Sequence, residues 1–215
     1  MKIKNKTLQK ALHNKSIVIG VAMVLAVILA AIFAPLLTPF DLDVMDMPNA
    51  LKAPDSQHWF GTDQYGRDLL TRIIYGARIS LIVGFVSVAI SMIIGVALGL
   101  TAGYYGGIVD NIIGRIIDVF LSFPVLLLAI ALVAVLGAGT YSVIIALCVV
   151  QWTQYARVVR SSVLSIREEE YVMAARTIGA SNARIMFRYV LPNALAPVIV
   201  IATLGIGTAI VSEAT

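Results

Sequence analysis

Charged side chains and cysteine are scarce in this sequence. Charged residues make up 13% of the 215 positions, about half of the roughly 25% that is usual in a soluble domain. The one cysteine, Cys148, cannot form an intrachain disulfide, and it stands in an apolar stretch where we expect it to pack like a small apolar side chain. The composition therefore argues against an ordinary soluble domain.

Sequence signatures of catalysis are missing as well. No glycine is followed directly by lysine, so the chain lacks the Gly-x-x-x-x-Gly-Lys-[Ser/Thr] loop that cradles nucleotide phosphates. The apolar stretches contain no His-Glu-x-x-His, no Ser/His or Cys/His pair and no paired aspartates, one of which an intramembrane enzyme would need. We therefore expect no catalytic residue, no metal site and no cofactor bound by this chain.

Apolar sequence is abundant instead. Hydrophobic residues form 60% of the chain, and charge is absent from residues 16–40, 79–109, 119–156 and 189–212. A membrane-spanning helix needs roughly 20 apolar residues, and each run is at least that long. In lipid the backbone must satisfy its own hydrogen bonds, and continuous rather than alternating apolar runs favour helices over a barrel. The sequence therefore predicts an all-α, polytopic membrane helix bundle.

These runs predict how the chain is organised. The run 119–156 is too long for one crossing, and the glycines of Gly137-Ala-Gly-Thr140 are expected to divide it into two helices. A further helix begins after Pro192 and is unfinished at Thr215, so five crossings are visible, and we expect a sixth beyond a truncated C-terminus. The expected segments are an N-terminal segment at 1–16, a membrane helix at 17–37, an outer segment at 38–78, and a core at 79–215 with helices at 79–105, 119–136 (kinked at Pro124) and 141–157, a partly helical connector at 106–118 and a polar loop at 158–192.

The distribution of charge predicts the sides of the membrane. The first fifteen residues hold five lysines and no acid, and residues 157–188 hold six arginines against three glutamates. By the positive-inside tendency both segments are cytoplasmic, whereas residues 38–78, with six aspartates, are outside. His13 and His58 then lie on opposite sides and share no metal site. The net charge of +4 does not indicate a nucleic-acid partner.

Small residues recur every four positions along the expected helix 79–105. Residues spaced in this way share one helix face, and a strip of small residues lets another helix approach closely. The alternative is that glycine is simply common in membrane helices. We assign Gly95, Gly99 and Gly103 to helix packing. The strip comprises Ser87, Ser91, Gly95, Gly99, Gly103 and Gly107.

The polar stretch before Pro192 is interpreted as two short helices hinged at a glycine. Ser165 and Glu168 have the spacing of a capping box, and the acids that follow suit the first turn of a helix. Gly179 is a natural C-terminal stop, and Ser181 can cap a second helix over 182–190 that ends before the proline. One interpretation is an amphipathic loop resting on anionic lipid. The other is a lever that a soluble partner grips.

This stretch resembles the cytoplasmic Glu-Ala-Ala loop of permease subunits in ATP-binding-cassette importers. The family pattern is Glu-Ala-Ala, three residues, glycine, nine residues, isoleucine, one residue and Leu-Pro. Here Met173-Ala174-Ala175, Gly179 and Tyr189-Val190-Leu191-Pro192 keep the spacing. Met173 replaces the glutamate and Tyr189 replaces the isoleucine, so Glu168 to Glu170 would have to supply the charge.

Two more motifs are similar to the second permease chain of the dipeptide, oligopeptide and nickel branch. They are His58-Trp-Phe-Gly-Thr-Asp-Gln-Tyr-Gly-Arg-Asp68 and Tyr75-Gly-Ala-Arg-Ile-Ser-Leu81. The resemblance covers nearly the whole chain and implies a type I importer transmembrane domain in a bacterial plasma membrane. The implied cargo is dipeptides or oligopeptides, with nickel or a metal–chelator complex as the alternative. The implied partners are a second homologous permease, two ATPase subunits that hold ATP and magnesium, and an extracytoplasmic solute-binding protein.

The resemblance also implies two sets of site residues. The loop would insert into a groove on an ATPase subunit, a device that a simple channel would not need. The outer segment would contact the binding protein, although its charged side chains could equally brace the segment internally. Glu213, an acid at the end of the last apolar run, is a further candidate by its position in the sequence, and it could face the translocation path or pair within the bundle. The coupling set is Glu168, Glu169, Glu170, Tyr171, Ala174, Ala175, Arg176, Gly179, Ala180, Ser181 and Arg184, and the binding-protein set is Asp63, Arg67, Asp68 and Arg72.

Overall fold

The computed structural model describes residues 13–214, and the protein is all-α. Regular structure in this range is helical apart from one antiparallel bridge between Thr62 and Asp68. The chain divides into two compact units, residues 1–81 and 82–215, which are described separately. Within the described range four helices are long and apolar enough to cross a membrane, or up to five if one bent pair is a single span. The predicted N-terminal segment, 1–16, lies almost entirely outside the described residues.

The first unit contains α2 (Lys15–Ile32), α3 (Ala34–Leu37), the 3-10 turn η1 (Met47–Asn49) and the start of α4 (Leu69–Tyr105). The helix α4 begins at Leu69, not near residue 79 as expected, so the connection after α3 is shorter than the predicted 38–78 segment. The reason is a cap: the Asp68 carboxylate accepts hydrogen bonds from the Thr71 N–H and hydroxyl, both at 2.7 Å. An aspartate three residues before a threonine is a local signal that could have predicted this start.

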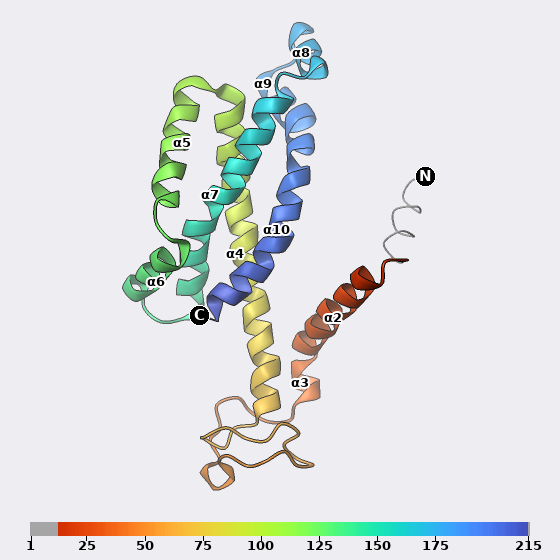
Figure 1. Cartoon of the computed structure of the whole chain (residues 1–215), viewed down its shortest axis with the longest axis vertical. Helices are drawn as coiled ribbons and strands as arrows, with labels where there is room; N and C mark the ends of the chain where they lie inside the picture. Colours follow the sequence, from red (N-terminus) through yellow and green to blue (C-terminus); the bar gives the residue numbers. More distant parts are fainter. Residues whose placement is uncertain (1–12, 215) are drawn as a thin grey trace. The chain divides into compact units, whose positions relative to one another are not determined.

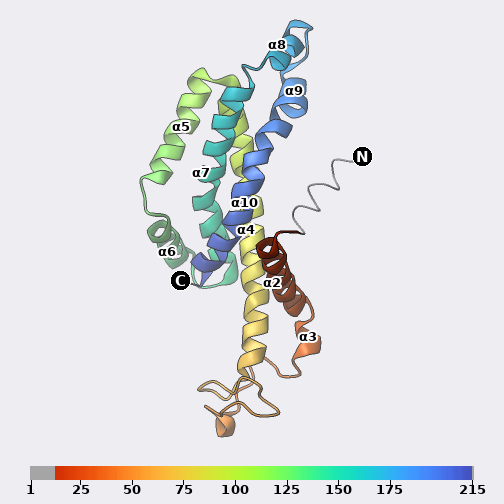
Figure 2. The ribbon, with the colours of Figure 1, turned by 45° about the vertical axis from the view of Figure 1, so that its right-hand side comes forward.

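The second unit is a helical bundle. In Figures 1 and 2 the later part of α4 runs beside α7 and α10, and α5 runs beside α7. The turn between α6 and α7 contains Gly137 and Gly139 at positive φ, which confirms the predicted division of the 119–156 run. The elements are α5 (Gly107–Leu121), α6 (Val125–Leu136), α7 (Thr140–Ile166), α8 (Glu170–Thr177), α9 (Asn182–Ile185), the π-turn η2 (Met186–Val190) and α10 (Leu191–Glu213).

The helices α4 and α7 meet along the strip of small residues. A Cβ atom added at Gly95 would lie 2.6 Å from the Trp152 carbonyl oxygen, and one at Gly103 would lie 2.8 Å from the Val163 Cβ. At Gly99 it would overlap the Ala156 carbonyl oxygen. Real carbon contacts are about 3.5–4.0 Å, so these three glycines allow the two backbones to touch.

The expected third crossing, 119–136, is not one helix. The helix α5 already begins at Gly107, so the expected connector is helical, and Pro124 stands between α5 and α6, which are bent by 85°. Proline lacks the N–H that would continue the helix and its ring clashes with the preceding turn. An ion pair fastens α5 to α7, in which Arg160 Nη2 lies 2.8 Å from Asp110 Oδ2.

The second arm of the polar loop also differs from its prediction. The segment 182–190 does not stop before Pro192 but continues through η2 into α10, forming one 32-residue helix from Asn182 to Glu213. Because proline cannot donate to the carbonyl four residues earlier, a wide π-turn precedes it, and the Leu191 N–H bonds to the Met186 carbonyl. The predicted capping box is wrong, because Ser165 lies inside α7 and Glu169 occupies the N-cap of α8.

Candidate functional site

The predicted coupling residues lie where α7 ends and α10 begins. The polar loop predicted at 158–192 is shorter in the structure, because α7 continues to Ile166 instead of ending near residue 157 and α10 continues the helix that begins at Asn182. From here on the polar loop is residues 167–185, which contain α8, the turn at Gly179 and α9. Gly179 has a φ of 78°, the left-handed conformation expected at a helix stop. The Ser181 hydroxyl then caps α9 by accepting the Arg184 N–H at 3.4 Å. The loop forms one end of the second unit in both views (Figures 1 and 2).

The helix α8 has a buried face and an exposed face. Val172 is fully buried and Ala175 is 4% exposed, and both belong to the same apolar core as Ile185 and Val190. On the opposite face Met173 is 47% exposed, and just beyond the helix Ile178 is 82% exposed. Of the two alanines predicted to couple, Ala174 is therefore available to a partner, whereas Ala175 holds the loop to the bundle.

The charges of the polar loop are mostly uncommitted. Glu168 pairs with its neighbour Arg167, at 2.9 Å, and Arg167 also donates to the Gly103 carbonyl of α4. Glu170 lies in the first turn of α8 and Arg176 in the last, which suits the helix dipole. Among the described residues no ion pair involves the exposed set Glu169, Glu170, Arg176 and Arg184. Ala180 is half-buried and packs against the core.

Besides the bond from Arg167 to the Gly103 carbonyl, two side-chain hydrogen bonds between tyrosine and asparagine tie the loop to the membrane helices, and sequence reasoning missed both. The Tyr104 hydroxyl at the end of α4 donates to Asn182 Oδ1 of α9 at 2.9 Å. The Asn193 amide of α10 donates to the Tyr171 hydroxyl of α8 at 3.2 Å and to the Tyr189 carbonyl at 2.7 Å. The first bond joins residues 78 positions apart, a separation that no local sequence signal could have linked.

The second predicted set is committed within the first unit. The Asp63 carboxylate accepts the N–H groups of Tyr65 and Arg67 and pairs with Arg67 Nε at 2.8 Å and Arg72 Nη1 at 2.5 Å. Burial opposes its ionisation, but these donors outweigh burial and lower the pKa of Asp63 to about 2. This network braces the segment, in line with the internal role that the sequence left open. A contact with a binding protein stays a prediction.

Asp68 is held in the same way. Its carboxylate lies 3.0 Å from His58 Nδ1 and caps α4 through Thr71, while Phe40 packs on the His58 ring. Burial favours the neutral form of Asp68, yet the hydrogen bonds from Thr71 and His58 prevail and lower its pKa. The two aspartates are thus charged anchors that fold the segment on itself.

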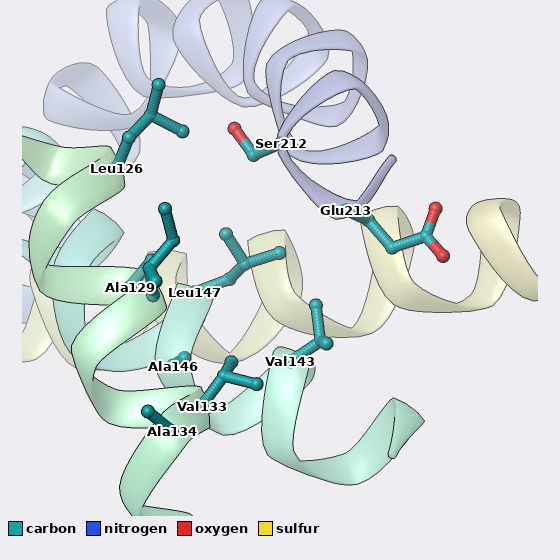
Figure 3. A pocket seen from close by; sticks show the side chains of 10 residues that line it. Leu126, Ala129, Val133, Ala134, Val143, Ala146, Leu147, Ser212 and Glu213 are labelled. Atoms are coloured by element: carbon teal, nitrogen blue, oxygen red, sulfur yellow. The ribbon is translucent and has the colours of Figure 1, made fainter. Parts of the chain in front are cut away.

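A third feature is a cleft of about 370 Å³ between α6, α7 and the end of α10. Figure 3 shows aliphatic side chains such as Leu126, Val133 and Leu147 lining it, with Ser212 and Glu213 as the labelled polar residues. The acid that the sequence flagged therefore lies at the edge of an apolar cleft. Within residues 13–214 no group of three or more His, Cys, Asp or Glu side chains could hold a metal ion.

Comparison with known proteins relates the chain to transport systems. Residues 95–215 match the family described as "Binding-protein-dependent transport system inner membrane component", and residues 6–54 match the "N-terminal TM domain of oligopeptide transport permease C". The dipeptide transport system permease protein of Alkalihalophilus pseudofirmus is 51% identical over 94% of this chain and 66% of that protein. The oligopeptide transport system permease protein of Bacillus subtilis is 40% identical over the same shares.

A third relative shows similar coverage. The di/tripeptide transport system permease protein of Pseudomonas aeruginosa is 41% identical over 96% of this chain and 70% of that protein. The chain thus spans 66% to 70% of the length of these relatives.

Proposed function

The chain belongs to the family of binding-protein-dependent transport system inner membrane components and is a multi-pass membrane protein, and from this premise we propose that it is a permease subunit of an ATP-binding-cassette importer for dipeptides or oligopeptides. It would form half of the translocation path and would hydrolyse no ATP itself. The names of the relatives support peptides over the alternative cargo, nickel or a metal–chelator complex.

The observation that carries the proposal is the two-faced helix α8. Its inner face is buried in the bundle through Val172 and Ala175, so a force on α8 is passed to the core. Its outer side presents Met173 and Ile178 to solvent among exposed charges of both signs. An apolar pair with a charged rim is the usual composition of a protein contact, and an exposed helix laid in an apolar groove is a recurring mode of recognition.

The partners of the proposed importer follow from this role. A homologous permease would complete the path, and two ATPase subunits that bind ATP and magnesium would each grip one polar loop. An extracytoplasmic binding protein would deliver the peptide. The chain would lie in a bacterial plasma membrane with its N-terminus and polar loop in the cytoplasm, because its basic segments alternate with an acidic one. ATP binding would close the two ATPase subunits against each other, and this closure would shift the balance between the inward-open and outward-open states of the permease.

Cysteine crosslinking in the assembled complex tests the docking. Cys148 is buried and is first replaced by serine, after which Ile178→Cys and Val172→Cys are made separately. We expect Ile178→Cys to crosslink to the ATPase subunit and Val172→Cys, whose position is fully buried, not to react. If Ile178→Cys is instead shielded by lipid and never reaches the ATPase while the complex co-purifies, the loop rests on the membrane and the proposal fails.

Uptake measurements test the cargo. Proteoliposomes that contain the complex and its binding protein are given a labelled dipeptide, a labelled oligopeptide or Ni²⁺, with and without internal ATP. We expect ATP-dependent uptake of peptide. Uptake of Ni²⁺ without peptide would overturn the cargo assignment, and uptake without any ATPase subunit would overturn the importer assignment.

A further inference from the structure

Two tyrosine–asparagine hydrogen bonds lie on the route by which the polar loop would move the membrane helices. The helix α8 lies between two breaks in the helical backbone, at Arg167 to Glu169 and at Gly179, so it could pivot at either place, whereas α9 continues through η2 into α10. At Gly179 the turn is closed by backbone hydrogen bonds from the Gly179 and Ala180 N–H groups, while an added Cβ would meet nothing within 4 Å, so the outer side of the turn is open. The angle of α8 to the bundle therefore depends on side chains: on the packing of Val172 and Ala175 in the core and on the hydrogen bond between Tyr171 and Asn193.

The first bond joins the last turn of α4 to the first turn of α9. Tyr104 is 7% exposed, so its ring is part of the core, while its hydroxyl reaches Asn182 at the surface of the loop. Because the ring stays buried when only the hydroxyl is removed, the bond can be deleted without opening a cavity. Because the Tyr104 ring is rigid and buried, its hydroxyl group points in a fixed direction, towards Asn182.

The second bond joins α8 to the start of α10. Asn193 lies just after Pro192, where the π-turn leaves the helix with irregular backbone bonding, and its amide bridges the Tyr189 carbonyl and the Tyr171 hydroxyl. One side chain thus connects the loop helix that faces the proposed partner to the helix that crosses the membrane. These bonds fasten α8 to α10 and α9 to α4, and α9 is also continuous with α10 through η2.

We propose that Tyr104 and Asn193 are positioning residues that transmit movement of the polar loop into α4 and α10, an inference that rests on the proposed importer function. When an ATPase subunit displaces the loop, the two bonds make α4 and α10 follow instead of letting the loop turn at Gly179. Loss of a bond would leave assembly and ATP hydrolysis in place but would reduce the peptide carried for each ATP hydrolysed.

The experiment uses the complete complex in proteoliposomes. Tyr104→Phe removes only the hydroxyl, and Tyr105→Phe is the matched control. Tyr105 is 54% exposed, its ring contacts that of Tyr104, and its hydroxyl makes no hydrogen bond among residues 13–214. Peptide uptake and ATP hydrolysis are measured together. We expect Tyr104→Phe to lower the number of peptides carried per ATP about two- to tenfold, the range that one hydrogen bond corresponds to, and Tyr105→Phe to leave it unchanged.

Conservative substitutions of the partner residue sharpen the test. Asn182→Asp keeps an acceptor oxygen for the Tyr104 hydroxyl and should retain normal coupling, whereas Asn182→Leu should lose it as Tyr104→Phe does. Asn193→Ala should reduce coupling through the second bond. A purely structural role would change thermal stability in every disruptive variant and would leave the peptide-to-ATP ratio alone.

The outcomes separate the two levels of the argument. If Tyr104→Phe and Asn193→Ala carry as many peptides per ATP as Tyr105→Phe, the transmission role is refuted while the importer function stands. If the unmodified complex shows no uptake that depends on ATP, the proposed function itself is refuted. A variant that fails to co-purify with its partners counts against the inference, because the bonds would then serve assembly instead of transmission.

Discussion

Replacement of Gly99 by alanine should force α4 and α7 apart. The new Cβ would overlap the Ala156 carbonyl oxygen and would lie 2.9 Å from the Val159 Cβ. Neither of these atoms can move by rotation of a side chain, because one is backbone and the other is attached to it. Relief therefore requires a helix shift on the order of 1 Å towards the usual carbon contact distance, and overpacking of this kind costs about 1–3 kcal/mol.

Gly114→Ala is the matched control. This glycine also lies inside a helix, α5, but an added Cβ would meet nothing within 4 Å. Both variants gain the same intrinsic helix preference of alanine over glycine, about 1 kcal/mol, so that term cancels in the comparison. We expect Gly99→Ala to be less stable than Gly114→Ala by about 1–3 kcal/mol, the overpacking term alone.

The assay is reversible unfolding of both variants in the same detergent or bilayer mimic, with the whole chain. Gly84→Ala supplies a second check. Its added Cβ would lie 3.0 Å from the Ile210 side chain, so the second substitution Ile210→Ala should relieve the strain. No substitution of Val159 that keeps a Cβ should rescue Gly99→Ala. Equal stability of Gly99→Ala and Gly114→Ala would show that the two backbones do not touch.

Four further outcomes are expected. Asp63→Asn should loosen the segment between α3 and α4 and expose it to protease, since four donors lose a charged acceptor. The pKa of Asp63 is lowered to about 2 in the folded state, so its contribution to the stability of the segment is complete above the ordinary aspartate pKa, near 4, and is lost as the pH falls through about 2. Trp59 fluorescence measured against pH checks this, and a transition at a higher pH would contradict it. Gly66→Ala should unfold the same segment, because Gly66 has a φ of 75° and its new Cβ would overlap the Asp46 carbonyl. Gly76→Ala, where the added Cβ meets open space, should leave the segment folded. Comparable proteolysis of the two variants would contradict this. Ala175→Arg should lower the stability of the polar loop and Ala174→Arg should weaken only ATPase binding, as judged by thermal unfolding beside co-purification; the reverse order would mean that the buried face of α8 is misassigned.

Features of this protein that depend on neighbouring residues could be predicted from the sequence. The all-α class and the position of the apolar helices follow from the length of the charge-free runs, because a helix satisfies its own backbone and needs no distant partner. The turn at Gly137-Ala-Gly-Thr140, the stop at Gly179 and the cap at Ser181 likewise depend on neighbours a few residues away. The start of α4 was missed although Asp68 and Thr71 carry a local signal for it.

Two of the predictions that are wrong concern prolines, where the sequence allows either a break in the helix or a distortion within it. The sequence predicts a kinked helix at Pro124, where the structure has a break, and a helix end before Pro192, where the structure has a π-turn and a continuous helix. Both outcomes avoid the helical hydrogen bond that proline cannot donate, so the local sequence does not choose between them. The sequence also leaves open the role of the charged side chains in the first unit. A carboxylate such as that of Asp63 can pair with a partner protein or within its own segment, and in the structure it pairs with Arg67 and Arg72.

The sequence by itself determined that this chain is a helical membrane protein with one polar loop, because hydrophobic length and turn chemistry are properties of adjacent residues. Only the tertiary structure decided which side of α8 is buried, so that Ala175 packs inward and Ala174 faces out. It also decided that Tyr104 meets Asn182 across 78 positions. Such contacts depend on how separate helices pack against one another, and no pattern within either segment encodes that arrangement.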